Sequence, residues 1–187
     1  MTLQIQYVRI KCHFKWNDNG IIPRSLEDKL PNIVVVEGCA TAIKAEALVA
    51  TISPSGWWIG GLHDEIRRSS GNLFHATAEA AMPLQKGQVV FAPALITHGG
   101  CFASVIFVVE DQTMSVYEVM TLAFKAANNY RINSISVPTF NADIDDLVQL
   151  AQAIADFRSK SSTLEEITVV VSNENDKYVL EDELWLV

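Results

Sequence analysis

The amino-acid sequence predicts an α/β fold with three layers, in which a mixed, largely parallel sheet carries helices on both faces. Short runs of apolar, mostly β-branched residues recur along the chain, which is typical of strands buried on both faces. Segments with helical periodicity stand between several of these runs, and this alternation calls for parallel strands joined by right-handed crossovers. A loop rich in Gly and Pro, residues 53–61, separates a strand from a helix.

The length and composition predict one domain that spans residues 1–187. Of these residues, 49% are hydrophobic, which is enough to bury a core without disulfide or metal support. The three cysteines lie far apart and form no C-x-x-C motif, so we expect neither a disulfide framework nor a metal site. No cofactor motif is present, and we expect no cofactor.

The charge and hydropathy patterns exclude two classes of partner. The formal net charge is −8, whereas sequence-independent binding of nucleic acid requires Lys and Arg to neutralise phosphates. No apolar run approaches the roughly 20 residues of a membrane span, and the N-terminus alternates instead of forming a signal-peptide block. We therefore expect a cytoplasmic protein that binds neither nucleic acid nor membrane.

The first half of the chain contains both kinds of element. Residues 3–14 alternate between apolar and polar, which predicts a half-exposed edge or antiparallel strand. Pro31 and Gly38 bound the first buried strand, and Gly71 and Pro83 follow the two helices. We expect buried strands at 33–36 and 47–52 and helices at 62–70 and 73–82.

The second half repeats the order of strand, helix and strand. Apolar residues at helical spacing predict two amphipathic helices, and the remaining apolar runs predict four strands. The strands are expected at 88–92, 103–109, 132–137 and 167–171, and the helices at 116–127 and 144–155. The apolar tetrapeptide 184–187 is expected to dock as an edge element or to contact another subunit.

The loop at residues 53–61 is the predicted ligand-binding corner. A helix N-terminus that follows a strand and a glycine loop presents free backbone N–H groups to an anion such as a diphosphate. This predicts ligand contacts from the loop glycines and the helix start, at Gly56, Gly60, Gly61 and Leu62. G-x-G-x-x-G is absent, and Leu62 and His63 stand where a P-loop has Lys and Ser or Thr.

Polar and aromatic side chains beside this loop are candidates for chemistry or binding. His63 and Asp64 stand at the expected helix start, where they could position or activate a water molecule. The alternative is that Asp64 only complements the helix dipole. Trp57 and Trp58 could stack on a nucleobase, or one of them could be buried against the sheet.

Three further patterns point away from other chemistry. His98-Gly99-Gly100 is similar to the oxyanion loop of some esterases, but no G-x-S-x-G supplies a nucleophile. Cys101 beside this loop is interpreted as inert. His75 and Glu79 share a helical face without the H-E-x-x-H motif, and we interpret them as a surface pair.

Residues 33–171 resemble the macrodomain, a module that binds ADP-ribose. The family pattern Gly-Asp-Ile-Thr stands here as residues 38–41, and Asn-Ala-Ala-Asn as residues 50–53. The run of glycines survives as Gly60-Gly61, and the helix of the type Val-Asp-Gly-Ala-Ile-His-Arg-Ala-Ala-Gly is similar to residues 62–71. The late strand Ser-Ile-Ala-Phe-Pro-Ala matches residues 134–139. Residues 1–32 and 172–187 would flank this region within the same domain.

The resemblance implies a binding site and shows where this chain departs from it. Cys39 replaces the aspartate that contacts adenine in the family, and Ser53 replaces the asparagine that contacts the distal ribose. His63 stands where hydrolytic members carry an aspartate. The family's second phosphate loop is rich in glycine, whereas here the corresponding positions are Thr139, Phe140 and Asn141.

The sequence leaves three functions open. The first is binding of ADP-ribose or a related nucleotide, with an activity of the ADP-ribosyl hydrolase or ADP-ribose phosphatase type left undecided. The second is a binding or assembly module that has lost the nucleotide and forms a homo-oligomer through residues 184–187. The third is a partner domain similar to the N-terminal domain of leucine aminopeptidases, which would share the fold without its ligand.

Overall fold

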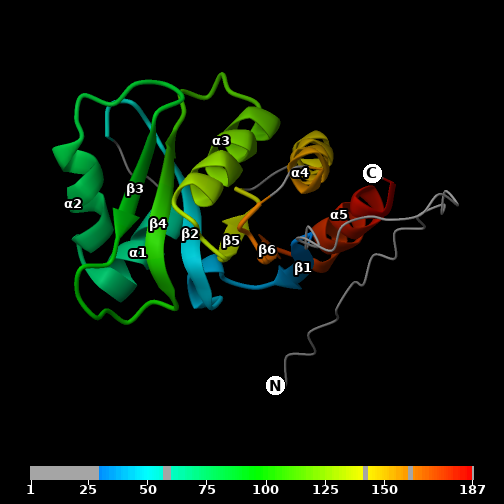
Figure 1. Cartoon of the computed structure of the whole chain (residues 1–187), viewed down its shortest axis with the longest axis horizontal. Helices are drawn as coiled ribbons and strands as arrows, with labels where there is room; N and C mark the ends of the chain where they lie inside the picture. The colour runs from blue at the N-terminus through cyan, green and yellow to red at the C-terminus, as the bar shows by residue number, and fades with distance from the viewer. Residues whose placement is uncertain (1–29, 57–59, 141–142, 160–161, 187) are drawn as a thin grey trace, which may run out of the picture.

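A computed structural model of the chain describes residues 30–56, 60–140, 143–159 and 162–186. Its centre is a six-stranded sheet with the strand order β1-β6-β5-β2-β4-β3 (Figure 1). The strands are β1 (Asn32–Glu37), β2 (Ala45–Ile52), β3 (Val89–Pro93), β4 (Phe102–Val109), β5 (Ser134–Pro138) and β6 (Glu166–Val171). The N-terminal strand that the alternating residues 3–14 predict lies outside the described residues.

The sheet is mixed and largely parallel, as the sequence predicts. All neighbouring strands from β1 to β4 in the sheet order run parallel, and only β3 runs antiparallel, against β4. In the register of the sheet, Leu48 of β2 lies between Val105 of β4 and Ser136 of β5. The parallel strands are rich in Val, Ile and Ala because both of their faces are covered by helices.

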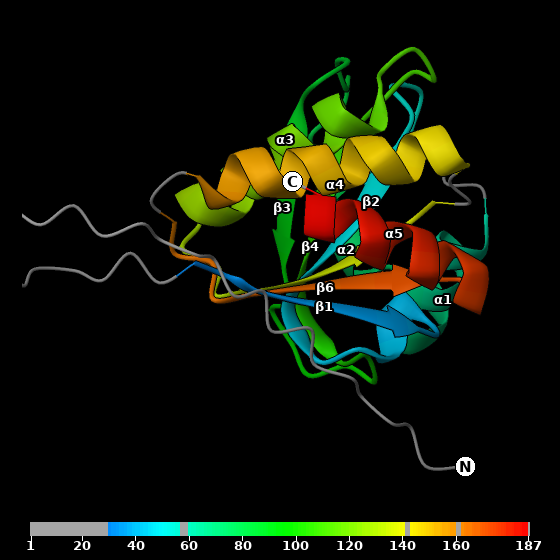
Figure 2. The same ribbon diagram turned by 90° about the vertical axis from the view of Figure 1, so that its right-hand side faces the viewer.

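Helices cover both faces of the sheet. The helices are α1 (Gly61–Ser70), α2 (Leu73–Ala80), α3 (Val116–Asn129), α4 (Ile144–Arg158) and α5 (Glu174–Leu186), with a short 3-10 turn η1 (Ala40–Ala42). Figures 1 and 2 show α3, α4 and α5 on one face and α1 and α2 on the other. None of the helices in the described part of the chain is long and apolar enough to cross a membrane.

The alternation of side chains along each strand divides the hydrophobic core between these two faces of the sheet. Ala47 and Val49 of β2 belong to the cluster that packs under α3, α4 and α5. Leu48 and Ala50 belong to the cluster that packs under α1 and α2. Successive side chains of a strand point to opposite faces, so one apolar strand serves both layers.

Side-chain caps start the two longest helices. Ser115 accepts a hydrogen bond from the backbone N–H of Glu118, whose side chain in turn accepts from the backbone N–H of Ser115. Asp143 and Asp146 form the same reciprocal arrangement at the start of α4. Each cap satisfies two backbone donors that a helix start otherwise leaves unpaired. The acidic residues after β5 therefore begin a helix.

The C-terminal segment forms the helix α5, which contacts α4 and the edge strand β1. In α5, Leu180 and Leu184 are buried in the core beneath it. Trp185 and Leu186 are 59% and 79% exposed. The tetrapeptide is therefore split: Leu184 packs inside, the next two residues face solvent, and Val187 lies outside the described residues.

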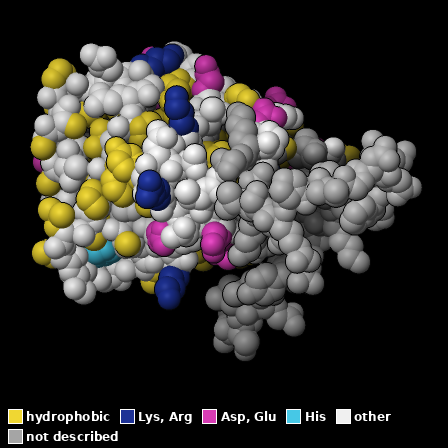
Figure 3. All heavy atoms as spheres, viewed as in Figure 1, with side chains coloured by type: hydrophobic (Ala, Val, Ile, Leu, Met, Phe, Trp, Pro, Cys, Tyr) yellow, Lys and Arg dark blue, Asp and Glu magenta, His cyan; other side chains and the backbone are white. Residues whose placement is uncertain are grey.

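The edge strand β3 borders an apolar surface. Figure 3 shows apolar side chains gathered on the side of the molecule that α2 and β3 form. On the loop between β3 and β4, Leu95 is 82% exposed and Ile96 is 68% exposed. An exposed sheet edge with apolar neighbours is a surface at which another chain could pack.

Candidate functional site

A cleft of about 360 Å³ lies at the carboxyl ends of the central strands. Its lining comes from the end of β2, the start of α1 and the loops that follow β4 and β5. The lining residues are Thr51, Ile52, Ser53, Gly60, Gly61, Leu62, His63, Glu110, Gln112 and Phe140. The carboxyl ends of parallel strands meet at one edge of a sheet, which is where α/β folds bind ligands.

The first turn of α1 forms one wall of the cleft. Gly60 has a φ of 125°, a backbone conformation that residues with a Cβ rarely adopt. A Cβ atom added to Gly61 would meet no atom within 4 Å, so the space beside this turn is open. The first N–H groups of a helix have no partner within the helix and carry a partial positive charge. This wall can therefore bind an anion.

The opposite wall contains two residues in strained backbone conformations. Gln112 has a φ of 65° and Phe140 a φ of 52°, in the left-handed region that costs a residue other than glycine about 1–3 kcal/mol. The Gln112 backbone N–H donates a 2.6 Å hydrogen bond to Oε2 of Glu110, and the Glu110 N–H donates to the carbonyl oxygen of Ile52. These contacts hold the loop after β4 against the end of β2.

The charge in the cleft is acidic. Glu110 is the charged carboxylate of the wall, and the described residues that line the cleft include no Lys or Arg. An anion in this cleft would be favoured by the backbone donors of α1 and opposed by the charge of Glu110. A hydroxyl or amino group of a ligand could instead donate a hydrogen bond to Glu110.

His63 joins α1 to β2 and α2. Its Nε2 lies 2.8 Å from the carbonyl oxygen of Thr51, and its Nδ1 lies 3.0 Å from Nε2 of His75. Because the carbonyl can only accept, Nε2 of His63 carries the proton and its Nδ1 accepts from His75. The two rings also lie close to the ring of Phe107, with centroids 6.3 Å and 5.5 Å away.

Burial keeps this histidine pair neutral. Burial is the largest influence on the pKa of His75 and lowers it from 6.5 to about 4, and the charges of His63 and Arg67 act in the same direction. Burial also lowers the pKa of His63, against the hydrogen bond to Thr51. His75 is 0% exposed, so its interpretation as a surface pair with Glu79 is wrong.

The predicted site residues divide into three groups. The cleft brings together Ser53, Gly60, Gly61, Leu62, His63 and Phe140. Asp64 is exposed, Gly56 and Thr139 are buried, and Cys39 is half-buried; none of these four lines the cleft. Trp57, Trp58 and Asn141 lie outside the described residues.

Cys39 has local partners of its own. Its thiol lies 2.8 Å from Oε2 of Glu65 and 2.9 Å from the hydroxyl of Thr41. Thr139 donates its backbone N–H to the carbonyl oxygen of Val170. The contacts of Cys39 join the start of η1 to α1, and the contact of Thr139 joins the end of β5 to β6.

Thr51, Ile52, Glu110 and Gln112 line the cleft although the sequence did not single them out. The available signal was position: two of them end β2 and two directly follow β4. Neighbouring parallel strands bring such positions together. For metal binding, the described residues contain no group of three or more His, Cys, Asp or Glu side chains that could hold an ion.

No protein-family model matches this sequence, and no curated protein is significantly similar to it. Solved macrodomain structures are nevertheless similar to the chain. A mutant macrodomain of Oceanobacillus iheyensis with ADPR superposes with a TM-score of 0.69 at 17% identity, covering 85% of this chain and 95% of that one. The Trypanosoma brucei macrodomain in complex with ADP-ribose superposes with a TM-score of 0.68 at 14% identity, covering 83% of this chain and 70% of that one.

The macro domain of ganglioside induced differentiation associated protein 2 gives a TM-score of 0.71 at 14% identity, covering 84% of each chain. At such identities the agreement concerns the fold alone. The predicted resemblance is therefore confirmed: this chain has the macrodomain fold.

Proposed function

We propose that the protein binds ADP-ribose or a related nucleotide in the cleft at the start of α1. The observation that carries this proposal is the meeting of the Gly60-Gly61 turn with Ser53 and Phe140 around one cleft of about 360 Å³. That volume lies within the usual range of small-molecule sites. Two of the similar structures, from Oceanobacillus iheyensis and Trypanosoma brucei, contain ADPR or ADP-ribose.

Each part of the lining suits a different part of such a ligand. The backbone N–H groups of the first turn of α1 would donate hydrogen bonds to the diphosphate, since this wall carries the positive end of the helix dipole. The Phe140 ring offers a face for a base or sugar. Glu110 would accept hydrogen bonds from ribose hydroxyls, which keeps the phosphates on the α1 side.

This proposal places binding ahead of hydrolysis. Both ring nitrogens of His63 are engaged by Thr51 and His75, so His63 could activate water only by giving up one of these bonds. Asp64 is exposed and lies outside the cleft lining. The predicted catalytic pair would therefore need a rearrangement of the start of α1 before it could act on a ligand in the cleft.

Calorimetric titration of the protein with ADP-ribose tests the proposal. We expect saturable binding of one ligand per chain. We expect Gly61→Val to weaken it by about tenfold or more, because the new side chain occupies the open space beside the helix start. Ala80→Val on α2 is the matched control, because Ala80 is exposed and does not line the cleft.

Two outcomes would contradict nucleotide binding. One is the absence of heat at millimolar ADP-ribose and ADP. The other is equal affinity of the protein and its Gly61→Val variant, since this would place the ligand elsewhere. Circular dichroism of both variants shows whether the fold is retained.

A second candidate function is an assembly module without a nucleotide. It is favoured by the acidic cleft and by the exposure of Trp185 and Leu186 at the end of α5. By this proposal the protein forms a homo-oligomer through α5, and replacing both side chains by Ser lowers the mass measured by light scattering to the 20.7 kDa of one chain. Leu184 is kept because it is buried. An unchanged mass would contradict assembly through this helix.

A further inference from the structure

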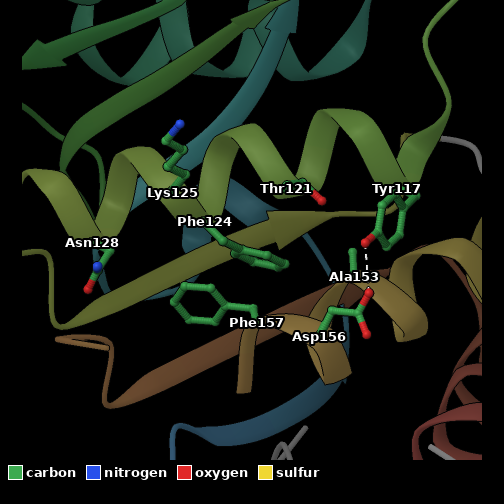
Figure 4. A pocket seen from close by; sticks show the side chains of 8 residues that line it. All are labelled: Tyr117, Thr121, Phe124, Lys125, Asn128, Ala153, Asp156 and Phe157. Atoms are coloured by element: carbon green, nitrogen blue, oxygen red, sulfur yellow. Dashed lines mark hydrogen bonds between the residues drawn. The ribbon is translucent and has the colours of Figure 1, made fainter. Parts of the chain in front are cut away.

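A second cavity, of about 260 Å³, lies between α3 and α4, away from the cleft at the strand ends (Figure 4). Its lining residues lie on one face of each helix. They are Tyr117, Thr121, Phe124, Lys125 and Asn128 of α3 and Ala153, Asp156 and Phe157 of α4. The cavity shares no residue with the cleft, and the proposed function makes no use of it.

Two half-buried aromatic side chains, Tyr117 and Phe157, line this second cavity, and Phe124, which is 1% exposed, packs against Phe157. The rings of Phe124 and Phe157 lie with their centroids 5.1 Å apart and an angle of 33° between their planes. Tyr117 stands at one end of the cavity, with its hydroxyl directed toward α4 (Figure 4). The faces of such rings carry a negative electrostatic potential that attracts cations.

A carboxylate is fixed beside these rings. Oδ2 of Asp156 accepts a 2.7 Å hydrogen bond from the hydroxyl of Tyr117, and Oδ1 accepts a 2.9 Å bond from Nε2 of Gln152. The bond to the carboxylate raises the pKa of Tyr117, so this phenol stays neutral and remains a donor. Lys125 is exposed and its side chain is directed away from the aromatic pair (Figure 4).

The chemistry of the cavity selects among ligand classes. An anion would be repelled by the carboxylate of Asp156. A neutral apolar group would remove water from this carboxylate without replacing the lost hydrogen bonds. A metal ion would find a single carboxylate. An alkylated ammonium group is attracted by the rings and by the carboxylate at once, and its alkyl groups can fill an apolar space. The volume suits a molecule smaller than a nucleotide.

We propose that the cavity between α3 and α4 binds a small organic cation through an alkylated ammonium group, which contacts the aromatic rings and the Asp156 carboxylate. Choline is the probe. Its neutral isostere 3,3-dimethylbutan-1-ol has the same shape but carries a carbon in place of the charged nitrogen. This pair isolates the charge without any change to the protein.

Titrations followed by NMR of the aromatic side chains test this site. We expect choline to bind saturably and the neutral isostere to bind about tenfold more weakly or worse. A short peptide with one trimethyllysine, titrated in parallel, tells a free small molecule from a modified protein side chain as the source of the group. Equal binding of choline and its isostere, or no saturable binding of either cation, would overturn the proposal.

Asp156→Asn is the decisive variant, because its amide oxygen can still accept from Tyr117 while the charge is lost. We expect about tenfold weaker choline binding, whereas Glu79→Gln on α2 removes a charge from the opposite face of the sheet and has no effect. An unchanged affinity in Asp156→Asn contradicts the site. Affinity for ADP-ribose reports separately on the cleft and is expected to stay the same in both variants.

Discussion

Replacement of Phe107 by Ala is expected to lower the free energy of unfolding by about 3–5 kcal/mol. Phe107 lies in the middle of β4, is fully buried and faces α1 and α2. Its removal would leave a cavity under both helices and would take away the ring that packs on His63 and His75. We expect both the cavity and the lost ring contacts to contribute to this loss of stability.

Chemical denaturation followed by circular dichroism measures this effect. Phe107→Leu fills part of the space and is expected to cost roughly half as much or less. Tyr130→Ala is the surface comparison, because Tyr130 is 51% exposed although it stacks on Phe91. A loss at Phe107 as small as the loss at Tyr130 would show that the core under α1 and α2 does not depend on this ring.

The protein is expected to lose about 2–3 kcal/mol of stability between about pH 7 and about pH 4 through its buried histidines. The pKa of His75 is about 4 in the folded state and 6.5 ordinarily, so the unfolded chain binds more protons across this window. The stabilisation is complete above the unfolded value and is lost as the pH falls toward the folded value. The lowered pKa of His63 acts in the same direction.

His75→Gln isolates this contribution, because its amide can still donate to His63 but does not titrate in this range. We expect the variant to show a shallower decline of unfolding free energy with falling pH than the native chain. His98→Gln on the β3–β4 loop, whose His98 contacts Phe74 and Phe102 instead, is the control.

The charged groups near the pair bear on the same measurement. Arg67 lowers the pKa of both histidines, and Asp64 raises that of His63. Hydrogen bonds to Thr113 and Ser115 lower the pKa values of Asp111 and Glu118, so these carboxylates also make the free energy of unfolding fall at lower pH. This contribution is the same in the native chain and in His75→Gln. Identical pH profiles of the native chain and His75→Gln would contradict the role of the pair.

The part of the candidate site that could be predicted from the sequence is the part that lies within one continuous segment. The glycine turn can be recognised from its residue types and from its place between a strand and a helix. Gly60 to His63 line the cleft, as this pattern predicts. Glu110 and Gln112 carry no such local signal. They reach the cleft because β4 lies beside β2 in the sheet, and that pairing joins residues about 60 positions apart.

The contact between His63 and His75 could likewise not be predicted from the sequence, although the two residues are only 12 positions apart. His75 and Glu79 have the spacing of neighbours on one helical face, which is all that periodicity reports. Whether that face meets solvent or the sheet depends on how α2 turns after α1. The structure turns His75 inward to His63, 12 positions earlier in the chain.

The sequence by itself determined the order of strands and helices, the glycine turn before α1 and the resemblance to the macrodomain, because side-chain periodicity and turn residues act over a few neighbouring positions. Only the tertiary structure decided that the C-terminal segment is a helix with Leu180 and Leu184 inside, that the cleft is acidic, and that Asp156 meets Tyr117 between two helices. These features arise where separate elements pack together, and the free energy of that packing depends on contacts that no single segment contains.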